Sequence, residues 1–244
     1  MTRAPKLILW DVDGTLVWTG PATRVAFDRA VASVLQQAIG DHEVSFGGKT
    51  DPQIALEIMS ALSVSDEEAR EHLPGVIQAL EREMEAAVEL LQREGRVLPG
   101  VLELLDRLDR WPHVRQSVLT GNTEANARLK IAAFGLDGYL DLDIAAFGSD
   151  SPDRNQLVQI ALEKCAQLRN RWIAPDDVWV IGDTALDLAC ARAGGARCLL
   201  VATGRVPFEE LEMAGADATF PDLSEVDEIE HLLLAPAVTE PSSP

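Results

Sequence analysis

The sequence predicts an α/β fold: a doubly wound parallel sheet with a smaller α-helical domain inserted after the first strand. Two observations favour this fold. Short apolar runs with little alternation, which suit parallel strands covered on both faces, recur between stretches of helical periodicity. One long region near the N-terminus, by contrast, shows helical patterns alone. At 244 residues the chain is long enough for a core domain and a smaller one.

The first expected strand is the apolar run LILW at residues 7–10. From about Pro21 to Arg96, only helical patterns are present. The expected helices of this stretch cover residues 22–39, 52–62 and 66–92. A crossover between parallel strands needs only about a dozen residues, so the stretch is longer than the sheet requires. We therefore expect a helical domain at residues 18–96, inserted in a core formed by residues 1–17 and 97–244.

Strands and helices alternate in the rest of the chain. The further expected strands cover residues 116–119, 144–147, 178–181 and 198–201. The expected helices cover residues 101–110, 122–134, 155–168 and 185–193. Turn residues mark their limits, because Gly100 precedes the first helix and Gly135 and Gly194 follow two others. Residues 222–234 suit a short amphipathic helix, and residues 235–244 are expected to be disordered.

Composition and charge exclude several classes of protein. Hydrophobic residues make up 47% of the chain and charged residues 25%, as in ordinary soluble globular proteins. The formal net charge of −19 argues against binding to nucleic acid or to an anionic membrane surface. No apolar run reaches the roughly 18 residues of a membrane helix, and the first residues do not resemble a signal peptide. Three cysteines without a CxxC pair fit a reduced, cytoplasmic protein, which we expect to be a monomer or a homodimer.

Polar segments follow the expected strands where ligands of open α/β sheets bind, beyond the carboxyl ends of the strands. These segments are residues 11–15 (DVDGT), 120–122 (TGN), 148–154 (GSDSPDR) and 182–187 (GDTALD). They would bring several carboxylates to one edge, where the carboxylates repel one another unless a cation or protons neutralise them. Mg²⁺ favours carboxylate, carbonyl, water and phosphate oxygens. The sequence therefore predicts Mg²⁺-dependent chemistry on a phosphate ester.

The first segment supplies two acids with different possible tasks. Asp11 could attack phosphorus and form an aspartyl-phosphate. Residues two apart in a strand point to the same side, so Asp13 could pass a proton to the leaving oxygen. Arg154, at an expected helix start, could balance charge on the transferring phosphoryl group. Alone, however, a DxD pair is often a turn or a cap, and an arginine in a first helical turn is often only solvated.

The segment TGN could hold the phosphate. Thr120 offers a hydroxyl group, and the backbone N–H groups of Gly121 and Asn122 would lie at a helix start, which is a natural anion site. The simpler interpretation is a turn leading into a helix, and GDTALD could equally be only a capped helix start. The functional interpretation depends on the order of all the segments and on their placement after strands.

This order resembles the haloacid dehalogenase superfamily over about residues 6–220. DVDGT looks like its first motif, LTGN like its second and IGDTALD like its fourth. The resemblance is nearest to the phosphoglycolate-phosphatase-like branch, whose members carry a helical cap of the C1 type between the first two motifs. It implies a Rossmann-like core under such a cap, and a small phosphorylated metabolite as the partner.

The resemblance also implies roles for single residues. Asp11 would be the nucleophile and a Mg²⁺ ligand, and Asp13 the general acid/base whose backbone carbonyl also binds the metal. Asp183 would be the remaining protein ligand, and Asp187 would orient these groups from a second layer. Thr120 would contact the phosphate.

The third motif of the family is usually a lysine, but residues 148–154 contain none. Arg154 is the candidate for that place. Lys49, in the loop FGGKTDPQI of the expected cap, is expected near the leaving group of the substrate, although exposed lysines are usually just solvated. Lys130 is expected to lie too deep in the helix after TGN to reach a bound phosphate.

These observations favour a Mg²⁺-dependent phosphatase acting on a small phosphate monoester through an aspartyl-phosphate. One alternative is a phosphomutase of the same superfamily, which would return the phosphoryl group to a sugar. Another is a catalytically silent binding protein that keeps the fold.

Overall fold

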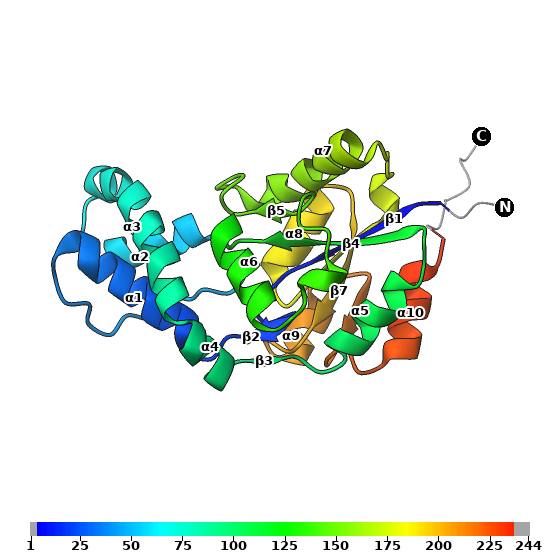
Figure 1. Ribbon diagram of the computed structural model, residues 1–244, viewed down its shortest axis with the longest axis horizontal. Coiled ribbons are helices and arrows are strands. Elements are labelled where there is room, and N and C mark those ends of the chain that lie inside the picture. Colours follow the sequence, from blue (N-terminus) through cyan, green and yellow to red (C-terminus); the bar gives the residue numbers. More distant parts are fainter. Residues whose placement is uncertain (1–3, 237–244) are drawn as a thin grey trace.

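The computed structural model describes residues 4–236. Its main sheet has six strands in the order β5-β4-β1-β6-β7-β8, and all neighbouring strands are parallel (Figure 1). These strands are β1 (Lys6–Trp10), β4 (Val114–Thr120), β5 (Ala146–Phe147), β6 (Val178–Gly182), β7 (Arg197–Val201) and β8 (Ala218–Phe220). The expected doubly wound parallel sheet is confirmed. The sequence pattern does not predict β8, because this edge strand is short and only partly buried.

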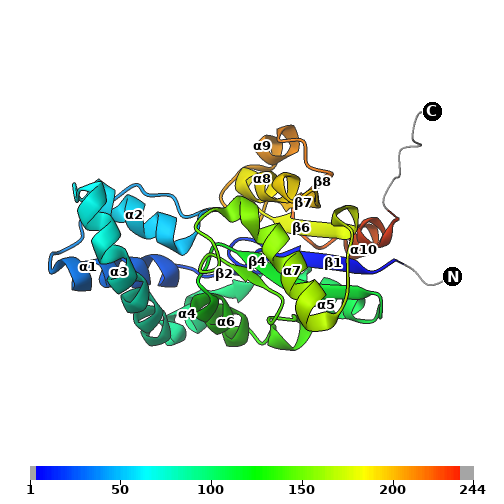
Figure 2. The same ribbon diagram turned by 90° about the horizontal axis from the view of Figure 1, so that it is seen from above.

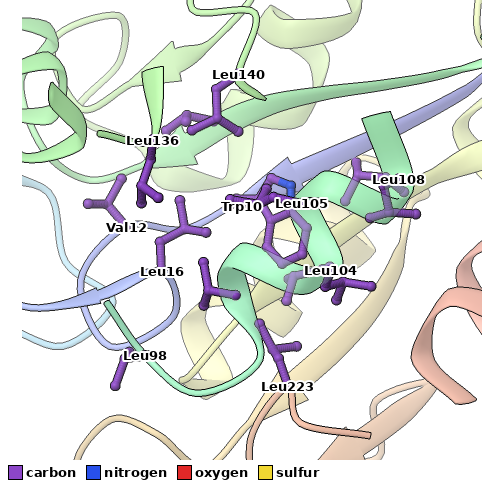
Figure 3. Packing of buried hydrophobic residues seen from close by; sticks show 14 of the residues in the cluster. Trp10, Val12, Leu16, Leu98, Leu104, Leu105, Leu108, Leu136, Leu140 and Leu223 are labelled. Atoms are coloured by element: carbon purple, nitrogen blue, oxygen red, sulfur yellow. The ribbon is translucent and has the colours of Figure 1, made fainter. Parts of the chain in front are cut away.

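Helices cover both faces of the sheet. The face that carries Ile8 and Trp10 packs against α5, α6 and α10, and the face that carries Leu7 and Leu9 packs against α7, α8 and α9. Because neighbouring residues of a strand point to opposite faces, the single run LILW supplies both hydrophobic cores. Figure 3 shows Trp10 among the leucines of α5. The helices are α5 (Val101–Asp109), α6 (Glu124–Ala133), α7 (Leu157–Arg169), α8 (Ala185–Ala193), α9 (Phe208–Met213) and α10 (Val226–Leu234).

The inserted region forms a helical cap. Its helices are α1 (Ala22–Leu35), α2 (Asp51–Ala61), α3 (Asp66–Ala86) and α4 (Val88–Glu94). The helices α1, α2 and α3 enclose a hydrophobic cluster of their own that includes Phe27, Ile58 and Leu80. Figures 1 and 2 place this cap at one end of the sheet, opposite the end where β1 begins. The carboxyl ends of the parallel strands therefore face the cap.

A two-stranded antiparallel ribbon joins the cap to the core. It consists of β2 (Val17–Trp18) and β3 (Arg96–Val97), in which Val17 pairs with Val97. The domain boundaries expected from the sequence fall within this ribbon, and we propose the ribbon as the limit between cap and core.

Several helix limits differ from those expected. The expected helix at residues 66–92 is two helices, because the backbone of Ala87 leaves the helical conformation at φ −92° and ψ 3°. The first cap helix ends at Leu35, since Gln36 has a left-handed backbone (φ 53°). Within residues 4–236, three short 3₁₀ helices are also present: Asp137–Tyr139, Arg154–Gln156 and Pro175–Asp177. Among the described residues, no helix combines the length and apolar composition needed to span a membrane. Residues 237–244 of the expected disordered tail lie outside the described residues.

Candidate active site

Three neighbouring strands deliver the first site residues. Asp11 follows β1, Thr120 ends β4 and Asp183 follows β6, and β1 lies between the other two strands. The backbone N–H of Asp11 still donates to the Ile181 carbonyl at 2.9 Å, so the sheet geometry continues up to this carboxylate. All three side chains are buried. They line a cavity of about 580 Å³ between core and cap.

The acidic residues form one cluster. Asp11, Asp183 and Asp187 each offer a carboxylate oxygen, and these oxygens all lie within 4.8 Å of one another. Burial raises the pKa of Asp11 to about 7, against the opposing charge of Arg154. Burial, together with the charges of Asp187 and Asp11, raises the pKa of Asp183 well above its usual value. Arg154 alone cannot neutralise the negative charges of three carboxylates.

The hydrogen bonds separate Asp183 from Asp187. One Asp187 oxygen accepts from the Thr184 backbone N–H at 3.0 Å and from its hydroxyl group at 2.7 Å, and the other oxygen accepts from Arg154. Oδ1 of Asp183, by contrast, is buried without a hydrogen-bond partner. An orphan carboxylate oxygen beside a second buried carboxylate suits a divalent cation. Asp11 and Asp183 thus fit a metal, whereas the oxygens of Asp187 are already engaged.

Two glycines allow the chain to close around Asp183. A Cβ atom at Gly14 would lie 2.4 Å from Oδ2 of Asp183, and one at Gly204 would lie 1.7 Å from the same atom. Gly14 also has a left-handed backbone (φ 86°), which favours glycine. The Thr203 hydroxyl ties the two loops by donating to the Gly14 carbonyl at 2.6 Å. The loop after β7 is thus part of the site, which the sequence did not predict.

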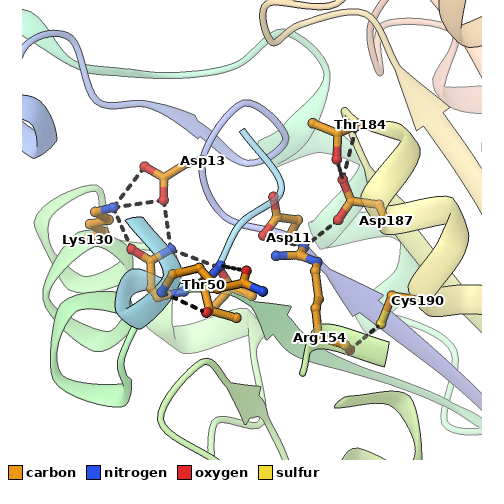
Figure 4. A network of polar contacts seen from close by, with 11 residues as sticks. Asp11, Asp13, Thr50, Lys130, Arg154, Thr184, Asp187 and Cys190 are labelled. Atoms are coloured by element: carbon orange, nitrogen blue, oxygen red, sulfur yellow. Dashed lines mark hydrogen bonds and ion pairs between the residues drawn. The ribbon is translucent and has the colours of Figure 1, made fainter. Parts of the chain in front are cut away.

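Arg154 reaches the cluster from the 3₁₀ turn that precedes α7. Its Nη2 lies 3.3 Å from Oδ1 of Asp11 and also contacts Asp187 (Figure 4). Although burial opposes the charge, the carboxylates of Asp187 and Asp11 raise the pKa of Arg154. The structure therefore places Arg154 beside Asp11, the residue that is expected to be the nucleophile.

The segment Thr120–Asn122 leads from the end of β4 towards α6. Thr123 is the N-cap of this helix, so Gly121 and Asn122 precede the helix instead of opening it, contrary to the expected start at residue 122. The Asn122 side chain donates to the Thr120 hydroxyl at 2.8 Å and to Asp13 at 2.7 Å. Thr120, Gly121 and Asn122 all line the cavity with Asp11 and Asp13.

Lys130 also lines this cavity and contacts two site residues, a placement that the sequence did not predict. Its Nζ donates to both oxygens of Asp13 at 2.9 and 2.8 Å, and to Oδ1 of Asn122 at 2.6 Å (Figure 4). Helical side chains lean toward the N-terminus of their helix, so a lysine two turns in can reach back to the loop before it. Asn126 and Lys130 lie four residues apart on the same face of α6, and this spacing is the signal that could have revealed the role of Lys130.

The cap contributes the loop before α2. Lys49 lines the cavity, and its Nζ pairs with Glu57 of the same helix. Thr50 is the N-cap of α2. The next residue, Asp51, contacts the core: its carboxylate accepts hydrogen bonds from the Thr123 N–H at 2.8 Å and from the Asn126 side chain at 3.0 Å. Burial raises the pKa of Asp51 to about 6. Asp51 is a tie between cap and core that sequence reasoning missed.

Known proteins resemble this chain in sequence and in fold. A family model described as haloacid dehalogenase-like hydrolase matches residues 5–195. Phosphoglycolate phosphatase 1 of Pseudomonas aeruginosa is 26% identical over 205 residues, which are 83% of this chain and 71% of that protein. Phosphoglycolate phosphatase of Nitrosospira multiformis is 25% identical over 230 residues, which are 92% and 95% of the two chains. A solved structure from Clostridium acetobutylicum, described as a predicted phosphatase, has the same fold, with a TM-score of 0.70, 21% identity and coverage of 95% and 99%.

Proposed function

This chain belongs to the haloacid dehalogenase-like hydrolases, and from that membership we propose that it hydrolyses a small phosphate monoester through a phosphorylated Asp11, with Mg²⁺ as its cofactor. The observation that carries the proposal is the environment of Asp11. This buried carboxylate lies 3.3 Å from Nη2 of Arg154 and belongs to an acidic cluster in which Oδ1 of Asp183 has no hydrogen-bond partner. Two relatives that are phosphoglycolate phosphatases support a small phosphorylated metabolite as the substrate.

The side chains divide the reaction between them. The Asp11 carboxylate attacks phosphorus, while Asp13 protonates the departing ester oxygen and later takes a proton from the water that hydrolyses the aspartyl-phosphate. Arg154 and the Thr120 loop stabilise the charge on the phosphoryl oxygens. Mg²⁺ held by Asp11, Asp183 and the Asp13 carbonyl would neutralise the cluster and the phosphate charge.

The test is phosphate release from p-nitrophenyl phosphate and from a panel of phosphorylated metabolites that includes 2-phosphoglycolate. We expect release with Mg²⁺ and none after chelation with EDTA. A phosphomutase would instead move the phosphoryl group between sugar positions with little free phosphate. Binding of esters without either reaction would favour a silent binding protein and contradict the proposal.

The metal assignment gives a first prediction. Asp183→Asn should raise the Mg²⁺ concentration needed for half-maximal activity, because it removes the negative charge of one of the two carboxylates that fit the cation. Asp187→Asn should raise it less, because Asp187 is held by Thr184 and Arg154. The measurement is a Mg²⁺ titration of activity for both variants, with thermal unfolding to monitor the fold. A titration in which Asp183→Asn matches the unaltered enzyme would remove this assignment.

The cap loop gives a second prediction. We propose that Lys49 contacts the leaving group, so Lys49→Ala should change kcat/KM by different factors for different esters. The expected changes are about 2- to 5-fold, as for a partly exposed ionic contact. Glu57→Gln is the matched variant, because it frees Lys49 from its partner and leaves the lysine in place. A common factor for all esters would contradict a role in specificity, and no change would show a solvated lysine.

A further inference from the structure

Lys130 is buried, and its ammonium group donates hydrogen bonds to Asp13 and Asn122. It is 1% exposed. Buried lysines are rare and need partners for the ammonium group. Here Nζ has three acceptors at 2.6–2.9 Å, two of which are the oxygens of Asp13. The Asn122 amide accepts from the same ammonium group and donates to Asp13 in turn.

Burial alone does not fix the orientation of the Asp13 side chain. Its side chain is 35% exposed at the cavity, so solvent would allow several rotamers. Three hydrogen bonds from two buried residues hold both of its oxygens. A proton-transfer group must keep a narrow orientation toward the leaving oxygen.

We propose that Lys130, together with Asn122, is a positioning residue that holds the Asp13 carboxylate in the orientation for proton transfer to the leaving group. The inference rests on the proposed function, in which Asp13 is the general acid. Lys130 does not contact Asp11 among the described contacts, so its effect should pass through Asp13.

A second carboxylate supports the placement of this charge. Burial raises the pKa of Asp51, and the charge of Lys130 opposes this rise. Asp51 comes from the cap and binds the start of α6, the helix that carries Lys130. The ammonium group therefore lies near one carboxylate of the core and one of the cap.

The experiment compares leaving groups. It measures kcat/KM for p-nitrophenyl phosphate, phenyl phosphate and an alkyl phosphate, since this ratio covers only the steps up to departure of the leaving group. The p-nitrophenolate ion leaves without a proton, whereas an alkoxide needs one. Lys130→Met should lower kcat/KM about 10²-fold on the alkyl ester, the lower end of general acid catalysis, and only about 2- to 3-fold on the p-nitrophenyl ester.

Further variants separate positioning from stability. Asp13→Asn should show the same dependence on leaving group, and adding Lys130→Met to it should lower the alkyl rate no further. Lys130→Arg should recover part of the loss, and Asn122→Ala should repeat the pattern if Lys130→Met does not fold. Lys164→Met is the matched control, because Lys164 pairs with Asp150 outside the site.

The outcomes are distinct. Equal losses on all three esters, or further losses in the double variant, would overturn the positioning role in favour of a structural one. An unaltered enzyme that hydrolyses none of the esters would overturn the proposed function, and the inference with it.

Discussion

Asp11→Asn should abolish turnover, with kcat lowered by at least about 10³-fold, as when other covalent nucleophiles are removed. The amide has nearly the shape of the carboxylate but cannot attack phosphorus. Because Asp11 is buried and its pKa is raised by burial, removing the charge should not destabilise the fold. We therefore expect this variant to unfold at the same temperature as the unaltered enzyme or at a higher one.

The measurement is phosphate release on a substrate that the unaltered enzyme hydrolyses. Asp143→Asn is the matched control, because Asp143 is an exposed aspartate that pairs with Arg169 away from the site. Its activity should be unchanged. The intact mass of Asp11→Asn, taken after the assay, shows whether deamidation has restored the carboxylate. More than a trace of activity at the correct mass would contradict a nucleophilic Asp11.

Arg154→Ala should lower kcat by roughly 10²-fold or more, as for other groups that stabilise a transferring phosphoryl group. The same change leaves the fully buried Asp187 without its cation. Breaking a buried pair in this way costs about 3–5 kcal/mol of unfolding free energy. Arg154→Lys should recover part of both losses, because it restores the charge without the second N–H direction.

The control for Arg154 is Arg169→Ala. Arg169 also bridges two aspartates, Asp141 and Asp143, but lies outside the cavity. The Arg169→Ala variant should lose some stability but keep the kcat of the unaltered enzyme. Both quantities are measured for each variant. A near-parental kcat for Arg154→Ala in folded protein would show that another cation supplies the charge.

Local sequence patterns were enough to predict the sheet and the residues at its carboxyl edge. Apolar runs located β1, β4, β6 and β7, and parallel topology then brought Asp11, Thr120 and Asp183 together. Element ends were less predictable, because they depend on contacts such as the Thr123 cap of α6. The strand β8 depends on pairing with β7, which a short, half-buried segment does not reveal.

The residues that sequence reasoning missed act across long separations. Lys130 contacts Asp13, which lies 117 positions earlier, and Asp51 contacts Thr123 from 72 positions away. Their roles follow from how a long side chain leans along its helix and from where the cap comes to lie. Gly204 is similar, since only the fold shows that its missing side chain leaves room for Asp183.

We propose that the cap can be exchanged as a unit at the β2–β3 ribbon. Val17 and Val97 pair directly, so the chain leaves the core and returns to it one strand spacing apart, roughly 5 Å. Ends this close are the condition under which a domain can be inserted into a host fold or removed from it, and a two-residue turn could join Trp18 to Arg96. Asp11, Asp13, Arg154 and Asp183 all lie outside that segment. Recombination at the ribbon could therefore change which esters are admitted without rebuilding the nucleophile or its charge partners.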